Sequence, residues 1–225
     1  MNPLEHPHRL VAAGALGIAL TTAAEVLTAP YSAHVVLFEL NPAVHAVKVL
    51  AALVFVAGML ALAARYHAAL GRVGVGAAVA LAAATTTGAI PYSVVETTLD
   101  PRLTAAQAAA WLDAAYVAQL AWIGYLAMVG MLLILVGLVT LAAVVMRRRL
   151  LPRWRPLLSV AALPLGVLAG VLGETTGLPV PHPPAWVFLC LAIAYAAPLT
   201  SAPGSEPGRP TGSDRAAVAT GTTAP

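Results

Sequence analysis

Three glutamates are the residues of this chain with the clearest chemical potential. Each lies near the end of a long apolar stretch and precedes a proline by five residues, in the pairs Glu25 and Pro30, Glu96 and Pro101, and Glu174 and Pro179. An ionisable side chain inside a membrane segment is costly and usually serves a function. Because like charges repel, carboxylates that converge hold a proton or a cation between them. The pattern therefore predicts an acidic site shared by the three segments.

Two threonines accompany these glutamates. Thr22 precedes Glu25 by about one helical turn, so the two share a helix face. Thr87 precedes Pro91, which has no amide hydrogen and leaves the carbonyl of Thr87 free. We therefore take Glu25, Glu96, Glu174, Thr22 and Thr87 as the candidate ligand- or cation-binding residues. The alternative is that the glutamates only reach headgroup water at helix ends, and that Pro91 only kinks its helix.

No pattern in the sequence indicates a metal or a cofactor. The histidines form neither a His-x3-His nor a His-Glu-x2-His motif, and there is no glycine-rich phosphate loop. Cys190 is the single cysteine, so an intramolecular disulfide is impossible. We therefore expect no metal and no cofactor.

The elements that must position these residues are membrane helices. Hydrophobic residues make up 60% of the chain and charged residues 9%, whereas soluble domains carry about 25% charged residues. Six apolar stretches approach or exceed the roughly 20 residues that cross a bilayer, at 10–28, 43–64, 73–95, 114–146, 156–173 and 183–200. Backbone amides in lipid must be satisfied within each segment. The sequence predicts an all-α bundle of six transmembrane helices over residues 1–200.

The remaining residues, 201–225, are rich in Pro, Gly, Ser and Thr and have little apolar surface to bury. We expect them to form a disordered cytoplasmic tail.

Basic residues predict the orientation. With both termini cytoplasmic, ten of the 12 lysines and arginines lie inside, and only Lys48 and Arg102 lie outside. This predicts a multi-pass protein of the plasma membrane, of the bacterial inner-membrane type, with lipids as its partners. Because the excess of basic residues is explained by their retention on the cytoplasmic side, we expect no nucleic acid as a partner. A cleavable signal peptide ending near Ala24 is an alternative reading of the first segment.

Three functions remain open at this stage. The first is a small transporter-like or ligand- or cation-binding membrane protein with an outward-facing acidic site. The second is a membrane-embedded enzyme on a lipid or isoprenoid substrate, in which the same carboxylates act as general acids. The third is a structural or accessory subunit. Gly166 and Gly170 form a Gly-x3-Gly pair typical of close helix packing, within the bundle or in a homo- or hetero-oligomer.

Overall fold

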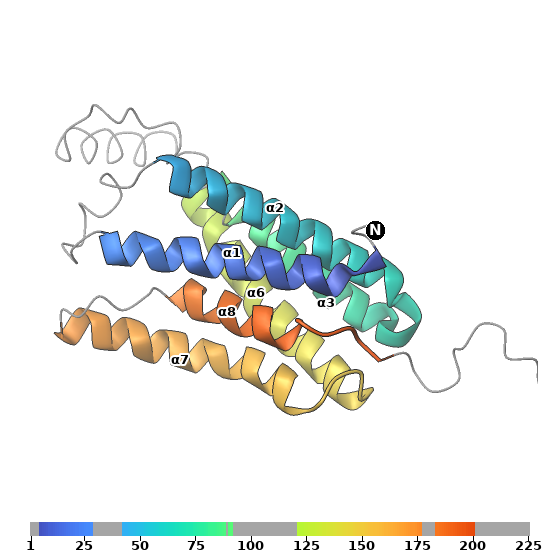
Figure 1. Cartoon of the computed structure of the whole chain (residues 1–225). Helices are drawn as coiled ribbons and strands as arrows, with labels where there is room; N and C mark the ends of the chain where they lie inside the picture. The colour runs from blue at the N-terminus through green and yellow to red at the C-terminus, as the bar shows by residue number, and fades with distance from the viewer. Residues whose placement is uncertain (1–4, 29–41, 89, 92–120, 177–182, 201–225) are drawn as a thin grey trace, which may run out of the picture.

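The computed structural model describes residues 5–28, 42–88, 90–91, 121–176 and 183–200, and within these residues the chain is helical and contains no strand (Figure 1). The helices are α1 (Pro7–Thr28), α2 (Pro42–Arg65), α3 (His67–Thr87), α6 (Ala121–Arg147), α7 (Trp154–Thr176) and α8 (Pro183–Ala194). The predicted all-α class is confirmed for this part of the chain.

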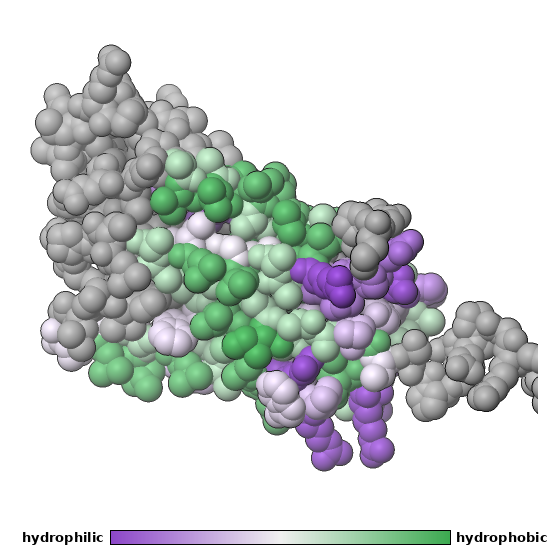
Figure 2. Space-filling model, in the orientation of Figure 1, coloured by the Kyte–Doolittle hydropathy of each residue, from purple (hydrophilic) through white to green (hydrophobic). Residues whose placement is uncertain are grey.

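Four helices are long and apolar enough to cross a membrane. They are the segments Ala43–Arg65, His67–Thr87, Val129–Arg147 and Trp154–Gly173. Large apolar side chains such as Leu50, Leu132 and Val167 are exposed on their outer faces, and Figure 2 shows apolar surface along the middle of the bundle. A soluble protein does not expose apolar surface on this scale. These features indicate a membrane-embedded protein.

The helices form a ring in chain order. Each of α1, α2, α3, α6, α7 and α8 packs against the next, and α8 closes the ring against α1. Side chains fill the interior: Phe55 of α2 meets Phe188 of α8 edge to face, with ring centroids 5.3 Å apart. Aromatic pairs prefer this geometry because the positive ring edge meets the negative face. The interior of the ring is thus a packed core around Phe55 and Phe188.

Glycines bring α1 and α2 into close contact along a line that we call the α1–α2 seam, defined by Gly14, Gly17 and Gly58. A Cβ atom at Gly17 would lie 2.7 Å from the Cβ of Ala51, and one at Gly58 would lie 2.6 Å from the backbone nitrogen of Val11. Small residues allow such contact in membranes, where close packing drives helix association. The seam therefore sets an antiparallel register between the two helices.

Small residues also line the buried face of α7. Ser159, Ala162, Gly166, Ala169 and Gly173 recur every three or four residues and are all buried, on a helix that packs against α8 and α6. Gly166 therefore lies on the buried face of α7, and a close helix contact through the Gly-x3-Gly pair stays a prediction.

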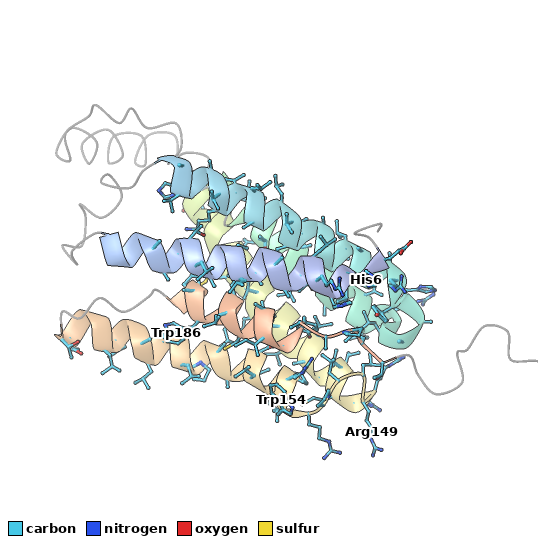
Figure 3. All side chains as sticks on the ribbon, viewed as in Figure 1. His6, Arg149, Trp154 and Trp186 are labelled. Atoms are coloured by element: carbon cyan, nitrogen blue, oxygen red, sulfur yellow. The ribbon has the colours of Figure 1, made fainter. Side chains whose placement is uncertain are left out.

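Most arginines gather at one end of the bundle, which we call the arginine end. It comprises Arg9, Arg65, Arg72, Arg147, Arg148, Arg149, Arg153 and Arg155, which flank the start of α1, the α2–α3 connection and the α6–α7 connection. Figure 2 shows hydrophilic surface there, and Figure 3 shows Arg149 and Trp154 pointing away from the helices at this end.

Hydrogen bonds tie the connections of the arginine end together. Nη1 of Arg148 donates to the carbonyl oxygens of Ala68 at 3.3 Å and Ala69 at 2.9 Å. The backbone leaves the helical conformation close to these carbonyls, at Gly71, where φ is +64°. At the same end, the backbone nitrogen of Thr200 donates to the carbonyl of Leu150 at 2.9 Å.

Two predicted segments differ from the helices found. The third segment was expected to run to residue 95; α3 ends at Thr87, Gly88 caps it, residues 90–91 are again helical, and residues 92–95 lie outside the described residues. The sixth was expected to run from 183 to 200, but α8 ends at Ala194 after 12 residues. Pro198 explains the second difference, since proline disfavours helix in the residue before it and cannot donate to the preceding turn.

Candidate functional site

Buried polar residues lie at the end of the core-facing row of α2. This row has a spacing of three or four residues and consists of His45, Lys48, Ala52, Phe55, Met59 and Leu62, all buried. Towards the arginine end the row is apolar. Towards the opposite end it finishes in Lys48, which is 8% exposed, and His45, which is 2% exposed. Charged residues are almost never this buried without a specific role or partner.

The core-facing row of α1 also changes from apolar to polar away from the arginine end. Val11, Ala15 and Ile18 are followed at the same spacing by Thr22, which is 4% exposed. The Oγ1 atom of Thr22 is buried and has no hydrogen-bond partner among the described residues. Its neighbour Thr21 differs, because its Oγ1 donates to the carbonyl of Gly17 at 2.8 Å. Thr22 therefore has a buried hydroxyl that no described residue satisfies.

The register of the α1–α2 seam places Thr22 of α1 at the same height along the bundle as Lys48 and His45 of α2. Gly17 of α1 lies against Ala51 of α2. In an antiparallel pair, moving five residues along α1 to Thr22 corresponds to moving back about five residues in α2, to the neighbourhood of Lys48. Thr22, Lys48 and His45 thus occupy the same half of the bundle, away from the arginine end.

The threonines of α3 satisfy their hydroxyls within the helix. The Oγ1 atom of Thr87 donates to the carbonyl of Ala83 at 2.9 Å, and that of Thr85 donates to the carbonyl of Leu81 at 3.0 Å. Such bonds to the preceding turn are common for threonine in membrane helices. Thr87, a predicted site residue, is therefore half-buried and bonded locally.

The three predicted glutamates lie largely outside the described part of the structure. Glu25 belongs to α1 and Glu174 to α7, in both cases near the helix end opposite the arginine end. Both helices pack against α8. The side chains of these two residues and the whole of Glu96 are outside the described residues. Their convergence on a single site stays a prediction.

Lys48 and His45 were not among the predicted site residues, although both were placed near the outer start of the second apolar segment. The signal that identifies them is spacing: both fall in register with Phe55, Met59 and Leu62 in the next turns of α2. A residue in register with core side chains faces the core, whatever its charge.

Within the described ranges, no group of three or more His, Cys, Asp or Glu residues is placed to hold a metal ion. Cys190 of α8 is buried as a free thiol. Buried cysteine most often packs as a small apolar side chain.

Comparison with known protein families, with curated proteins and with solved structures found no match for this chain.

Proposed function

We propose that the chain is a multi-pass plasma-membrane protein with six spans and with both termini in the cytoplasm. The gathering of arginines at one end supports this orientation, because basic residues flanking membrane helices are retained inside. Residues 201–225 then form a cytoplasmic tail. In this orientation Lys48 and His45 belong to the outer half of the bundle.

We further propose that this outer half binds a small ionic ligand, as a transporter-like or ligand-binding membrane protein does. The observation that carries the proposal is the burial of Lys48 on the core-facing row of a membrane-crossing helix. A charged side chain within a membrane segment is costly, and almost always faces the interior of the bundle. An ionisable group at such a position indicates a site for a ligand or for proton exchange.

The site then combines acidic and basic groups. Glu25, Glu96 and Glu174 supply carboxylates, Thr22 and Thr87 supply oxygen atoms, and Lys48 and His45 add positive charge and a hydrogen-bonding ring. Carboxylates and hydroxyls are ligands for cations and protons. The site therefore suits a small cation, with Lys48 offsetting part of the acidic charge.

The orientation is tested by labelling. In a Cys190→Ala background, Glu5→Cys places a thiol at the arginine end, and Thr175→Cys places one near the opposite end of α7, where both native residues are exposed. In intact cells a membrane-impermeant maleimide should label Thr175→Cys, and should label Glu5→Cys only after permeabilisation. Labelling of Glu5→Cys in intact cells contradicts the orientation.

Ligand binding is tested on the purified chain in lipid nanodiscs. A ligand that binds only the folded state stabilises it by RT ln(1 + [L]/Kd), so the unfolding temperature rises with ligand concentration. We expect at least one ion from a panel of Na⁺, K⁺, Ca²⁺ and alkylammonium salts to raise Tm, with the increase lost in Glu25→Gln. If no ion at constant ionic strength changes Tm, the proposed site is wrong.

A further inference from the structure

We propose that the start of α7 binds a phosphate group, carried by a membrane lipid or by a soluble anion. The donors are the guanidinium of Arg155 and the hydroxyl of Ser159, at the arginine end of the bundle. This site lies at the end of the bundle opposite the cation site proposed above, and it stands or falls independently of that site.

Two side chains of α7 bury hydrogen-bond donors that no described residue satisfies. The Nε and Nη1 atoms of Arg155 are buried and have no acceptor among the described residues. The Oγ atom of Ser159 is likewise buried without a partner there, and Ser159 as a whole is 1% exposed. Buried donors without a partner are rare in native proteins and indicate a missing acceptor, such as a water molecule or an ion.

Ser159 differs in this respect from threonines of α1 and α3. Thr21 and Thr85 each donate to a carbonyl oxygen of the preceding helical turn, which is the usual arrangement for a hydroxyl in a membrane helix. The hydroxyl of Ser159 makes no such bond to a described residue. It is therefore available to donate to a ligand.

Arg155 and Ser159 lie on one face of α7. Residues four apart in a helix are neighbours, with Cβ atoms about 6 Å apart. Ser159 begins the buried row that continues through Ala162 and Gly166, and Arg155 stands one turn before Ser159, towards the arginine end. A phosphate group accepts hydrogen bonds through several oxygen atoms and pairs well with the planar guanidinium. Two donors at this spacing therefore suit a phosphate.

Trp154 indicates the depth of Arg155 in the membrane. The Cζ atom of Arg155 lies 5.2 Å from the centroid of the Trp154 ring, and Trp154 is 56% exposed at the arginine end (Figure 3). Tryptophans at the ends of membrane helices lie at the level of the lipid headgroups. Stacking on the ring engages the face of the guanidinium, whereas its N–H donors lie in the plane and still need acceptors. These donors therefore lie at the depth of lipid phosphates.

The electrostatic environment of this site is positive. The N-terminus of α7 contributes the positive end of the helix dipole, which favours phosphate. Among the described residues, the acidic side chain at this end is the exposed Glu5, at the start of the chain. Four further arginines lie in or beside the α6–α7 connection: Arg147, Arg148, Arg149 and Arg153. Basic clusters next to membrane helices attract anionic lipids, so an anion is the class of ligand that this environment stabilises.

The site is tested by titrating the purified full-length chain in a neutral detergent and measuring Tm at constant ionic strength. The probes are dihexanoyl phosphatidylglycerol, as a lipid source of phosphate, and inorganic phosphate, as a soluble source. A probe that binds the folded state should raise Tm with its concentration. A rise with either probe supports the site and identifies the source. No rise with either probe, or an equal rise with uncharged dihexanoyl phosphatidylcholine, overturns the site.

Arginine variants separate this site from a general attraction of anions to positive charge. Arg155→Gln should raise the apparent Kd of the active probe about tenfold, because it removes charge-assisted hydrogen bonds. Arg153→Gln removes the same charge two residues earlier from an exposed position and should raise Kd by about twofold or less. Equal effects of the two variants contradict a specific site.

Two conservative variants keep the test decisive if Arg155→Gln does not fold. Arg155→Lys keeps the charge but loses the planar pair of donors, and should raise Kd several-fold. Ser159→Ala should leave Tm unchanged or higher without the anion, because no hydrogen bond to a described residue is lost, and should also raise Kd several-fold. An unchanged Kd in both variants excludes these donors from the site.

Carboxylates of the C-terminal residues are a competing source of an acceptor. The chain continues from Thr200, whose backbone nitrogen donates to the carbonyl of Leu150 at 2.9 Å, and residues 201–225 include Glu206 and Asp214. The double variant Glu206→Gln, Asp214→Asn should keep the Tm and the Kd of the wild type. A fall in its Tm, together with a wild type that responds to neither probe, assigns the donors to a carboxylate and overturns the phosphate site.

Discussion

Polar side chains inside the bundle are accommodated in two different ways. Thr21, Thr85 and Thr87 each donate to a carbonyl three or four residues earlier in their own helix, which leaves no exposed polar hydrogen in the apolar interior. Thr22 has a buried Oγ1 atom with no hydrogen-bond partner among the described residues, and Lys48 is buried on the core-facing row of α2. At the scale of single residues, this difference separates structural polar groups from candidate functional ones.

Thr22 and Thr21 provide a matched comparison. Thr21→Val should lower the free energy of unfolding by about 1 kcal/mol, because it removes a hydrogen bond and leaves Gly17 with one fewer donor. Thr22→Val should leave Tm of the ligand-free protein nearly unchanged, since its Oγ1 has no partner among the described residues. It should instead reduce the Tm shift caused by a bound ion. The measurement is thermal unfolding with and without that ion, and the opposite pattern would exclude Thr22 from the site.

His8, at the arginine end, predicts a pH dependence of stability. Burial lowers the pKa of His8 below its usual value of 6.5, and the charges of His6, Arg9 and Arg65 lower it further. Because the folded protein disfavours the protonated ring, stability is full above about pH 6.5 and is lost as pH falls through the lowered pKa.

The measurement is Tm between pH 7.5 and pH 5 for the wild type, for His8→Gln, and for His67→Gln as a control at an exposed histidine. His8→Gln should flatten the dependence and His67→Gln should not. An unchanged slope in His8→Gln would assign the effect to other groups.

At the scale of elements, backbone geometry limits which helices form and how closely they pack. Proline ends helical structure after α8, and glycines allow α1 and α2 to approach until backbone atoms touch. The same principle applies between α3 and α6, where a Cβ at Gly137 would lie 3.1 Å from the carbonyl oxygen of Ala77. Helix contacts in a membrane depend on such close approach because burial of apolar surface from water contributes little there.

Alanine substitution of the seam glycines should separate α1 from α2. Gly14→Ala and Gly58→Ala would each place a Cβ against backbone atoms of the other helix, and we expect a loss of about 1–3 kcal/mol in the free energy of unfolding. Gly76→Ala is the control, because a Cβ there has nothing within 4 Å. It should be neutral or stabilising, since alanine favours helix. Equal losses at all three positions would show that close contact at the seam does not determine the effect.

At the scale of the whole molecule, the arginine end joins segments that are distant in sequence. Arg148 connects the α6–α7 turn to the α2–α3 turn, and Thr200 connects the end of the described chain to Leu150. These links join the two halves of the ring at the end where the sequence already concentrates positive charge.

Arg148→Ala should weaken this connection. It removes the donors to the carbonyls of Ala68 and Ala69, and we expect a loss of about 1 kcal/mol, limited by the exposure of the guanidinium. Arg153→Ala removes the same charge at the same end from an exposed position and should change stability by less. Thermal unfolding of the two variants in nanodiscs separates a hydrogen-bonding role from a pure charge effect. Equal losses would argue against the specific link.

Much of this architecture is predictable from the sequence because lipid imposes few solutions on a backbone. A segment in the bilayer must satisfy its own amides, so apolar length alone predicts where helices lie, as for α2, α6 and α7. The sequence was less informative at the end of the last segment. There Pro198 ends the helix earlier than apolar length suggests, because a hydropathy average does not account for the missing amide hydrogen of proline.

The candidate site was likewise predictable from the sequence only in part. Composition and charge by themselves determined the class of protein, the positions of the apolar helices and the clustering of arginines, since these depend on local sequence and on the solvent. Only the tertiary structure decided that Lys48 and His45 face the core with Thr22 at their level, because the direction of a side chain depends on which helix packs against it. That direction determines whether a polar side chain of a helix lies at the surface or in the core.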